Sequence, residues 1–336
     1  MRRSRLAAVC VLISALLLGG CGATAATEQH TVALVAKSTQ TEFWLSVFAG
    51  AEAAATEYNL KLTITGPETE EDYEAQNRMV ADAVAAGAEA LVFSAIDYEN
   101  NASAIDDAAR AGVKIVAIDS SVASEMVSTY IGTDNYAAGR MAAQAALERV
   151  EGELTVGIVN YDISSANGQE REHGAVDLLQ ESGRAEVAAV INTLAEAGQA
   201  KEDTEAMLAE HPEINVLLAF NEPTSVGAAE AVSALGLSES VFLVGFDSNV
   251  VTVDGLQEGS VDALVVQNPY AMGYLGVESA YKLLAGQGDS LEKTVDTSTQ
   301  VVDRENIFTM DSQKALFAFE QLKTQHVEQN GILQFN

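Results

Sequence analysis

Residues 31–65 read TVALVAKSTQTEFWLSVFAGAEAAATEYNLKLTIT. This stretch begins with a short, mostly apolar run at 31–36 that is typical of a strand, and a second, β-branched run follows at 60–65. Between them, residues 43–58 are rich in Ala and long enough for about four helical turns. A strand, a helix and another strand in this order predict two parallel strands joined by a crossover helix.

The same alternation continues almost to the end of the chain and predicts an α/β protein with parallel sheets. The expected strands are 31–36, 60–65, 90–94, 114–118, 127–131, 154–159, 186–191, 216–220, 241–246 and 262–266. The expected helices are 43–58, 73–86, 102–111, 137–150, 169–182, 204–210, 225–235 and 272–285. Gly87, Gly112 and Gly286 fit helix C-caps, where the left-handed conformation favours glycine.

A chain of 336 residues exceeds what one hydrophobic core usually supports, so two domains are expected. Residues 31–133 hold five expected strands, and residues 135–266 hold a second set of five. No Pro-rich or Gly-rich linker separates the halves. We therefore expect the chain to cross between the two domains more than once.

The N-terminus has the pattern of a bacterial lipoprotein signal. Three arginines precede an apolar run at 6–18, and Leu18-Gly19-Gly20-Cys21 follows. The run is too short for a membrane span, which needs about 20 residues. We expect residues 1–20 to be a signal peptide, Cys21 to carry the lipid and residues 21–30 to be a tether. The protein would then be extracytoplasmic and lipid-anchored to the cell membrane.

The net charge of −31 argues against a nucleic-acid partner, because phosphates require clusters of Lys and Arg. Enzyme motifs are also missing from the sequence. Its four histidines, His30, His173, His211 and His326, have no metal-binding spacing, and no serine lies in a nucleophile elbow. The segment after the first strand, at 37–41, is not a phosphate loop. We expect no cofactor, no metal and no catalysis.

Ligands of open parallel sheets bind beyond the carboxyl ends of the strands. The polar residues at these ends are Lys37, Ser38, Thr41, Ser94, Asp97, Asp119, Ser120, Asp134, Asn135, Tyr161, Asp162, Asn221, Glu222, Asp247, Gln267 and Asn268. Carboxylates and amides among them suit a neutral ligand with many hydroxyl groups. Nearby aromatic rings can stack on the C–H face of a sugar.

Some of these residues also have simpler explanations. Asp134 and Asn135 fit a helix N-cap as well as they fit a ligand contact. Phe43 and Phe246 also fit the core, where a lone aromatic residue at a strand end usually lies. Asp119 and Asp247 each end a buried strand, where a carboxylate needs a partner, so a ligand contact is favoured for these two.

Several landmarks in order resemble the ribose-binding type of periplasmic sugar-binding proteins over residues 31–307. They are Glu42-Phe43-Trp44, Ile131-Gly132-Thr133-Asp134-Asn135 with Gly139, Arg171 with Gly174, Asn221, Val244-Gly245-Phe246-Asp247 and Gln267. The resemblance implies two Rossmann-like lobes with parallel sheets joined by a three-crossing hinge. The implied lobes are 31–133 with 268–296 and 134–267 with 297–310, followed by a C-terminal extension at 311–336.

The resemblance also implies binding roles. Phe43 and Trp44 match an aromatic pair that sandwiches the sugar, and Phe246 matches a ring that stacks from the other lobe. Asp119, Arg171, Asn221, Asp247 and Gln267 match residues that bond the hydroxyls. The sequence departs from the pattern of the ribose-binding proteins at Lys37, Thr41, Ser94 and Ser120. Near Ala195, it has no aromatic residue to match a second stacking ring of that family. Lys37, Thr41, Ser94 and Ser120 complete the predicted site. Because they differ from the ribose-binding pattern, they leave the identity of the ligand open to molecules other than ribose.

The implied function is that of a solute-binding lipoprotein that captures a monosaccharide or similar polyol and delivers it to the permease of an ABC importer. We expect the protein to be a monomer. One alternative is a receptor that presents a sugar or autoinducer-2 to a membrane kinase or chemoreceptor. A transcription regulator would need an N-terminal helix-turn-helix, a place that the signal peptide occupies. A secreted glycosidase would need an acid/base pair, for which Asp119 and Asp247 are the candidates.

Overall fold

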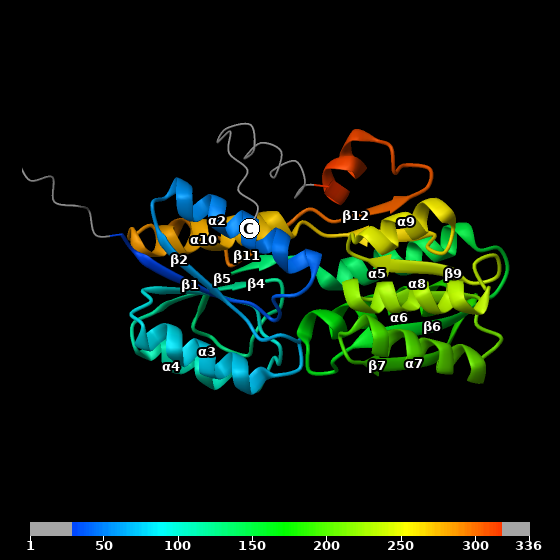
Figure 1. Cartoon of the computed structure of the whole chain (residues 1–336), viewed down its shortest axis with the longest axis horizontal. Helices are drawn as coiled ribbons and strands as arrows, with labels where there is room; N and C mark the ends of the chain where they lie inside the picture. Colours follow the sequence, from blue (N-terminus) through cyan, green and yellow to red (C-terminus); the bar gives the residue numbers. More distant parts are fainter. Residues whose placement is uncertain (1–28, 318–336) are drawn as a thin grey trace, which may run out of the picture.

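The computed structural model describes residues 29–317. The predicted signal peptide, the Cys21 lipidation site, most of the tether and residues 318–336 of the C-terminal extension lie outside them. Two α/β lobes lie side by side along the long axis of the molecule (Figure 1). The predicted fold class is confirmed.

The N-terminal lobe has a six-stranded parallel sheet in the order β11-β5-β4-β3-β1-β2. Its strands are β1 (Thr31–Val35), β2 (Lys61–Thr65), β3 (Ala90–Phe93), β4 (Lys114–Ile118), β5 (Val127–Gly132) and β11 (Thr294–Asp296). Its helices are α2 (Glu42–Glu57), α3 (Tyr73–Ala85), α4 (Ala102–Arg110) and α10 (Pro269–Leu284), with a 3-10 turn at Gly288–Ser290.

The C-terminal lobe has a second six-stranded sheet in the order β12-β10-β9-β8-β6-β7, in which β12 alone is antiparallel. Its strands are β6 (Leu154–Tyr161), β7 (Ala185–Thr193), β8 (Val216–Ala219), β9 (Phe242–Phe246), β10 (Ala263–Val266) and β12 (Gln300–Asp303). Its helices are α5 (Asn135–Arg149), α6 (Ala166–Ser182), α7 (Ala197–Glu210), α8 (Glu222–Leu235) and α9 (Val250–Glu258).

Side chains of each central strand alternate between two apolar layers. In β1, Val32 and Leu34 pack with α2 and α10, whereas Ala33 and Val35 pack with α3 and α4. The second sheet is covered in the same way by α5 and α6 on one face and by α7, α8 and α9 on the other. Strands buried on both faces read as continuous apolar runs, which is why they were visible in the sequence.

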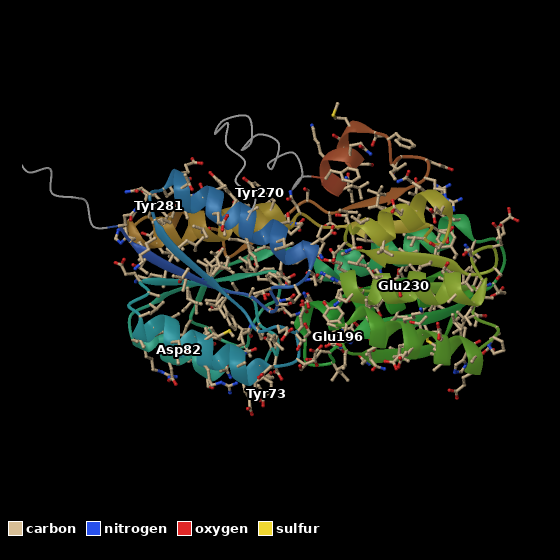
Figure 2. The ribbon with its side chains drawn as sticks, viewed as in Figure 1. Tyr73, Asp82, Glu196, Glu230, Tyr270 and Tyr281 are labelled. Atoms are coloured by element: carbon tan, nitrogen blue, oxygen red, sulfur yellow. The ribbon has the colours of Figure 1, made fainter. Side chains whose placement is uncertain are left out.

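The chain passes from one sheet to the other after β5, after β10 and between β11 and β12. These three passages put the carboxyl ends of the parallel strands of both sheets at the junction of the lobes. Figure 2 shows two residues at this junction, Tyr73 at the start of α3 and Glu196 before α7.

Four elements differ from the sequence prediction. Helix α9 and the short strands β11 and β12 were not predicted, and α7 begins at Ala197 instead of residue 204. An Asn249–Thr252 capping box begins α9, although its first turn is rich in the β-branched residues that favour strands. The other expected elements are confirmed to within a few residues, and Gly87, Gly112 and Gly286 have positive φ.

The described part of the predicted C-terminal extension is helical. Residues 310–317 are helical, and Leu316 packs with Val302 and Ile307 in the C-terminal lobe. The described region contains no helix of the length and hydrophobicity required to cross a membrane.

Candidate ligand-binding site

A small cavity of about 20 Å³ lies between the lobes. The residues that line it are Lys37, Thr41, Phe43, Trp44, Glu70, Asp119, Tyr161, Asn167, Arg171, Asn221, Glu222, Pro223, Asp247 and Gln267. Nine of the twelve predicted binding residues are among them. Such a volume holds about one water molecule, so the lobes meet closely at this point.

Lys37 lies in the cleft and touches both lobes. Its Nζ is 3.0 Å from Glu70 Oε2 and donates a 3.0 Å hydrogen bond to Ser165 Oγ of the C-terminal lobe. The ammonium also lies 5.1 Å from the centre of the Tyr161 ring. Burial by itself lowers the pKa of Lys37, but the nearby Glu70, Tyr161 and Asp119 together outweigh burial, and the pKa lies above its ordinary value. Lys37 is therefore a permanently charged donor.

Phe43 and Trp44 open helix α2, and their rings meet edge to face with centres 5.3 Å apart. Trp44 is buried, and its Nε1 donates a 2.9 Å hydrogen bond to Glu70 Oε1. Thr41 is the N-cap of α2, and its hydroxyl accepts from the backbone N–H of Trp44. Both rings pack into the core of the N-terminal lobe, and both also line the cavity.

Asp119 follows β4 in the left-handed conformation, with φ of 57°. Its carboxylate accepts hydrogen bonds from Ser94 Oγ at 2.9 Å and from Asn167 Nδ2 of the other lobe at 3.3 Å. Burial raises the pKa of Asp119 above its ordinary value. Ser94 does not line the cavity, and its hydroxyl helps to hold the Asp119 carboxylate in place through this hydrogen bond.

Arg171 is fully buried on α6 and is held by three acceptors. Its Nε donates to Asn135 Oδ1 at 3.0 Å, one terminal nitrogen donates to the Phe220 carbonyl, and the other donates to Gln267 Oε1 at 2.8 Å. The guanidinium lies 4.6 Å from the centre of the Phe246 ring. These contacts fix its planar fork beside the cavity.

Two glycines allow α6 to approach α5 closely enough for this arrangement. A Cβ atom on Gly139 would lie 1.9 Å from the backbone oxygen of Arg171, and one on Gly174 would lie 2.0 Å from that of Tyr136. The sequence landmarks Gly139 and Gly174 therefore serve the packing that places Arg171.

Asp247 follows β9 and also has a left-handed backbone, with φ of 65°. Its Oδ1 accepts a 2.7 Å hydrogen bond from Gln267 Nε2, and Gln267 Oε1 accepts a 2.9 Å bond from Thr133 Oγ1. Burial raises the pKa of Asp247 to about 7, although Arg171 acts in the opposite direction. The neutral and ionised forms are thus close in energy near neutral pH.

Helix α8 starts at the cavity with Asn221 as its N-cap, whose Oδ1 accepts from the backbone N–H of Thr224. The next residue, Glu222, accepts hydrogen bonds from the backbone N–H of Phe43 at 2.9 Å and of Glu42 at 3.2 Å. Asn249 donates to the same carboxylate at 2.8 Å. Glu222 therefore binds the N-terminus of α2 from the opposite lobe and contributes to closure of the cleft.

Two further predicted site residues lie away from the cavity surface. Phe246 is fully buried against Phe220 and beneath Arg171. The Ser120 hydroxyl is buried without a hydrogen-bond partner among the described residues, and its backbone N–H donates to Ser94 Oγ. Asp134 is the N-cap of α5, as the first of the two alternatives predicts, whereas Asn135 accepts a hydrogen bond from Arg171 and does not line the cavity.

Five lining residues were not among the twelve predicted: Glu70, Tyr161, Asn167, Glu222 and Pro223. The polar residues after the strands had included Tyr161 and Glu222. Glu70 lies in the loop before α3 and Asn167 in the first turn of α6, so their position relative to a strand gave no signal.

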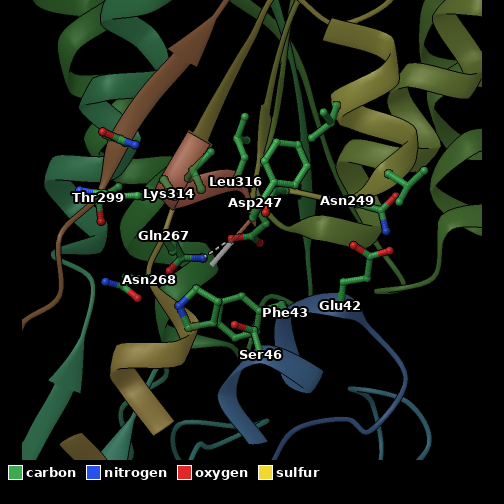
Figure 3. A pocket seen from close by; sticks show the side chains of 18 of the residues that line it. Glu42, Phe43, Ser46, Asp247, Asn249, Gln267, Asn268, Thr299, Lys314 and Leu316 are labelled. Atoms are coloured by element: carbon green, nitrogen blue, oxygen red, sulfur yellow. Dashed lines mark hydrogen bonds between the residues drawn. The ribbon is translucent and has the colours of Figure 1, made fainter. Parts of the chain in front are cut away.

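A larger cavity of about 550 Å³ adjoins the cleft and shares Phe43, Asp247 and Gln267 with it. Figure 3 shows the Asp247–Gln267 hydrogen bond between α2 on one side and Lys314 and Leu316 on the other. The lining of the larger cavity does not include the buried cations Lys37 and Arg171. No cluster of possible metal ligands occurs among residues 29–317.

The described geometry agrees with comparisons to known proteins. The family model of the periplasmic binding protein domain matches residues 32–288. The chain belongs to the periplasmic binding protein family. It is 31% identical over 286 residues to the D-ribose/D-allose-binding protein of Pseudomonas aeruginosa, covering 82% of this chain and 89% of that protein. The ribose import binding protein of Bacillus subtilis is 26% identical over 80% of this chain and 85% of its own length.

Solved structures of the same family superpose on both lobes. A carbohydrate-transporter solute-binding protein from Agrobacterium radiobacter, in complex with D-arabinose, has a TM-score of 0.83 and 27% identity over 86% of this chain and 99% of its own. An ABC-transporter solute-binding protein from Agrobacterium vitis with bound D-fucose has a TM-score of 0.82 and 27% identity, covering 85% and 99%. The chain is thus a type I, ribose-binding-like member of the family, whose named relatives are binding proteins and not enzymes.

Proposed function

We propose that this protein captures a monosaccharide or similar polyol in the cavity between its lobes and delivers it to the permease of an ABC importer. The observation that carries the proposal is the convergence of buried polar groups from both lobes. Lys37 and Asp119 come from one lobe, and Arg171, Asn221 and Asp247 come from the other. Donors and acceptors placed on opposite sides can bond several hydroxyls of one ring at once.

The chemistry of the site suits a neutral ligand. The positive charges of Lys37 and Arg171 face the carboxylates of Glu70, Asp119 and Asp247, so no uncompensated positive charge is available for a phosphate or carboxylate group. The aromatic faces of Phe43 and Trp44 offer apolar contact to a sugar ring. The ribose, allose, arabinose and fucose named for the relatives support a pentose or hexose.

Binding requires the lobes to separate and close again, because the cavity of about 20 Å³ is far too small for a sugar ring. The closed arrangement is held by contacts between the lobes, including Glu222 with the start of α2 and Lys37 with Ser165. A ligand that bonds both lobes adds free energy to the closed state alone. A permease that contacts both lobes can then distinguish the loaded protein.

The proposal includes the predicted lobe boundaries and the membrane anchor. The lobes would comprise residues 31–133 with 268–296 and residues 134–267 with 297–310. A lipid on Cys21 would keep the monomeric protein at the outer face of the cell membrane, beside its permease.

Titration of a panel of pentoses, hexoses and inositols tests the proposal. Trp44 is the single Trp of the chain and lines the cavity, so its fluorescence reports on the site. We expect one or a few sugars to give a saturable change without any chemical conversion of the ligand. A flat fluorescence and calorimetric response across the panel would contradict sugar capture, and turnover of a glycoside would contradict a purely binding role.

A further inference from the structure

Glu70 connects two side chains of the N-terminal lobe that line the cavity. It lies in the loop between β2 and α3, and only 11% of its side chain is exposed. One carboxylate oxygen is 3.0 Å from Lys37 Nζ, and the other accepts the 2.9 Å hydrogen bond from Trp44 Nε1. A single carboxylate therefore contacts both the ammonium and the indole.

Both partners need an acceptor where they lie. The Lys37 side chain is 2% exposed and Trp44 is 1% exposed, so neither polar group is available to bulk water. A buried ammonium without a counter-charge is strongly unfavourable, and a buried indole N–H normally has a partner. Glu70 satisfies both requirements from one position.

The ammonium is also restrained from the opposite lobe. Ser165 Oγ accepts from Lys37 Nζ, and the Tyr161 ring lies beneath it. Among the described residues, Asp119 and Tyr161 are the other titratable groups that act on Lys37. Glu70 is the charged group in direct contact with Lys37, so it decides where the ammonium is held when the lobes are apart.

We propose that Glu70 is a positioning residue of the binding site, which fixes the Lys37 ammonium and the Trp44 indole in the orientation that meets the ligand. This inference rests on the proposed capture of a sugar or polyol. Each carboxylate oxygen accepts from one of these two partners, so the proposed role is to hold Lys37 and Trp44, in addition to any hydrogen bond that a ligand hydroxyl donates to the remaining lone pairs.

The test compares Glu70→Ala and Glu70→Gln with the parent in calorimetric titrations of the sugar that the parent binds. Truncation leaves Lys37 and Trp44 without their acceptor, so we expect Glu70→Ala to weaken binding by about 30-fold or more. The amide of Glu70→Gln has one oxygen and can replace only one of the two acceptors, so its loss should be smaller. Glu68→Ala is the matched control, since this exposed residue lies in the same loop.

A pH series separates positioning from a merely structural effect. Without the Glu70 charge, Lys37 is deprotonated at a lower pH, so the affinity of both variants, divided by that of the parent, should fall between about pH 7 and pH 9. Glu70 also helps to raise the pKa values of Asp119 and Tyr161, so its removal lowers both and favours their ionised forms. An ionised Asp119 accepts a ligand hydroxyl more readily, so this change acts against the expected loss of affinity. The Trp44 emission should change in Glu70→Ala without any ligand.

The outcomes are distinguishable. A parent that binds no sugar of the panel overturns the proposed function and this role with it. A parent that binds, together with both Glu70 variants within about twofold of it and with the same pH profile, overturns the role of Glu70 alone. If Glu70→Ala does not fold, the nearly isosteric Glu70→Gln carries the test, and an unchanged affinity and pH profile in it is the contrary result.

Discussion

Replacing Asp247 by Asn should stabilise the ligand-free protein in a pH-dependent manner. The Asp247 carboxyl is 6% exposed, and burial raises its pKa from the ordinary value of 3.8 to about 7. An unfolded chain releases this proton near its ordinary pKa, whereas the folded protein retains it up to about pH 7. The stability cost of ionising Asp247 is therefore absent below about pH 4, grows as the pH rises and is complete above about pH 7.

The magnitude follows from the two pKa values. Each tenfold change in acidity is worth about 1.4 kcal/mol, so the interval between 3.8 and about 7 corresponds to about 4 kcal/mol. An Asn side chain carries no charge, can accept the hydrogen bond from Gln267 through Oδ1 and tolerates the left-handed backbone at this position. The change removes the cost of ionisation without removing the acceptor.

Urea unfolding followed by circular dichroism, between about pH 4 and about pH 8, measures the effect. The free energy of unfolding of Asp247→Asn minus that of the parent should rise by about 4 kcal/mol across this range, because all other titrating groups are common to both proteins. A difference that stays constant with pH would refute the assignment of a raised pKa to Asp247. The same variant should bind sugar weakly, which is the usual conflict between stability and function at a site.

Three further predictions concern closure, packing and the pH dependence of binding. Glu222→Ala removes the acceptor of two backbone N–H groups of α2, so sugar affinity measured by calorimetry should fall by about 10-fold to 100-fold. Glu230 lies on the same helix and is exposed, so Glu230→Ala is the control (Figure 2). An equal loss of affinity in both variants would contradict a role of Glu222 in closure. Gly139→Ala places a methyl group 1.9 Å from a backbone oxygen of α6 and should destabilise the protein by about 2 kcal/mol in urea unfolding. Gly198 has open space around it, so Gly198→Ala should be neutral or stabilising. Equal changes in the free energy of unfolding of the two variants would show that α5 and α6 are not tightly packed. Sugar affinity of the parent should rise between about pH 6 and about pH 8, because ligand hydroxyls donate to the ionised form of Asp247. A sugar affinity that falls over this range would show that the neutral acid is the binding form.

The sequence revealed the fold because its central strands are buried on both faces and its helices are rich in Ala. The same pattern located the site, since Asp119, Asn221 and Asp247 directly follow apolar strands. Position after a strand carries no information about residues that approach from loops or helices. Glu70 and Asn167 reach the cavity in that way, so their positions in the sequence did not distinguish them from other polar residues.

Orientation was also beyond the sequence. Phe246 and Ser94 were predicted to contact the ligand, yet one supports Arg171 and the other supports Asp119 from outside the cavity. Whether a side chain at the end of a strand faces the cleft or the layer beneath depends on the local backbone. In Asp119 and Asp247, a positive φ turns the chain at this point, and Asp is one of the few non-glycine residues that adopt it.

The central claim is that buried donors and acceptors from two lobes converge on one neutral sugar or polyol. Isothermal titration calorimetry of the parent, Arg171→Ala and Asp247→Ala with the panel of monosaccharides and inositols tests it most directly. We expect one sugar to saturate the parent with a negative heat-capacity change and both variants to lose this binding. A parent that binds none of the panel, or variants that bind as tightly as the parent, would contradict the claim.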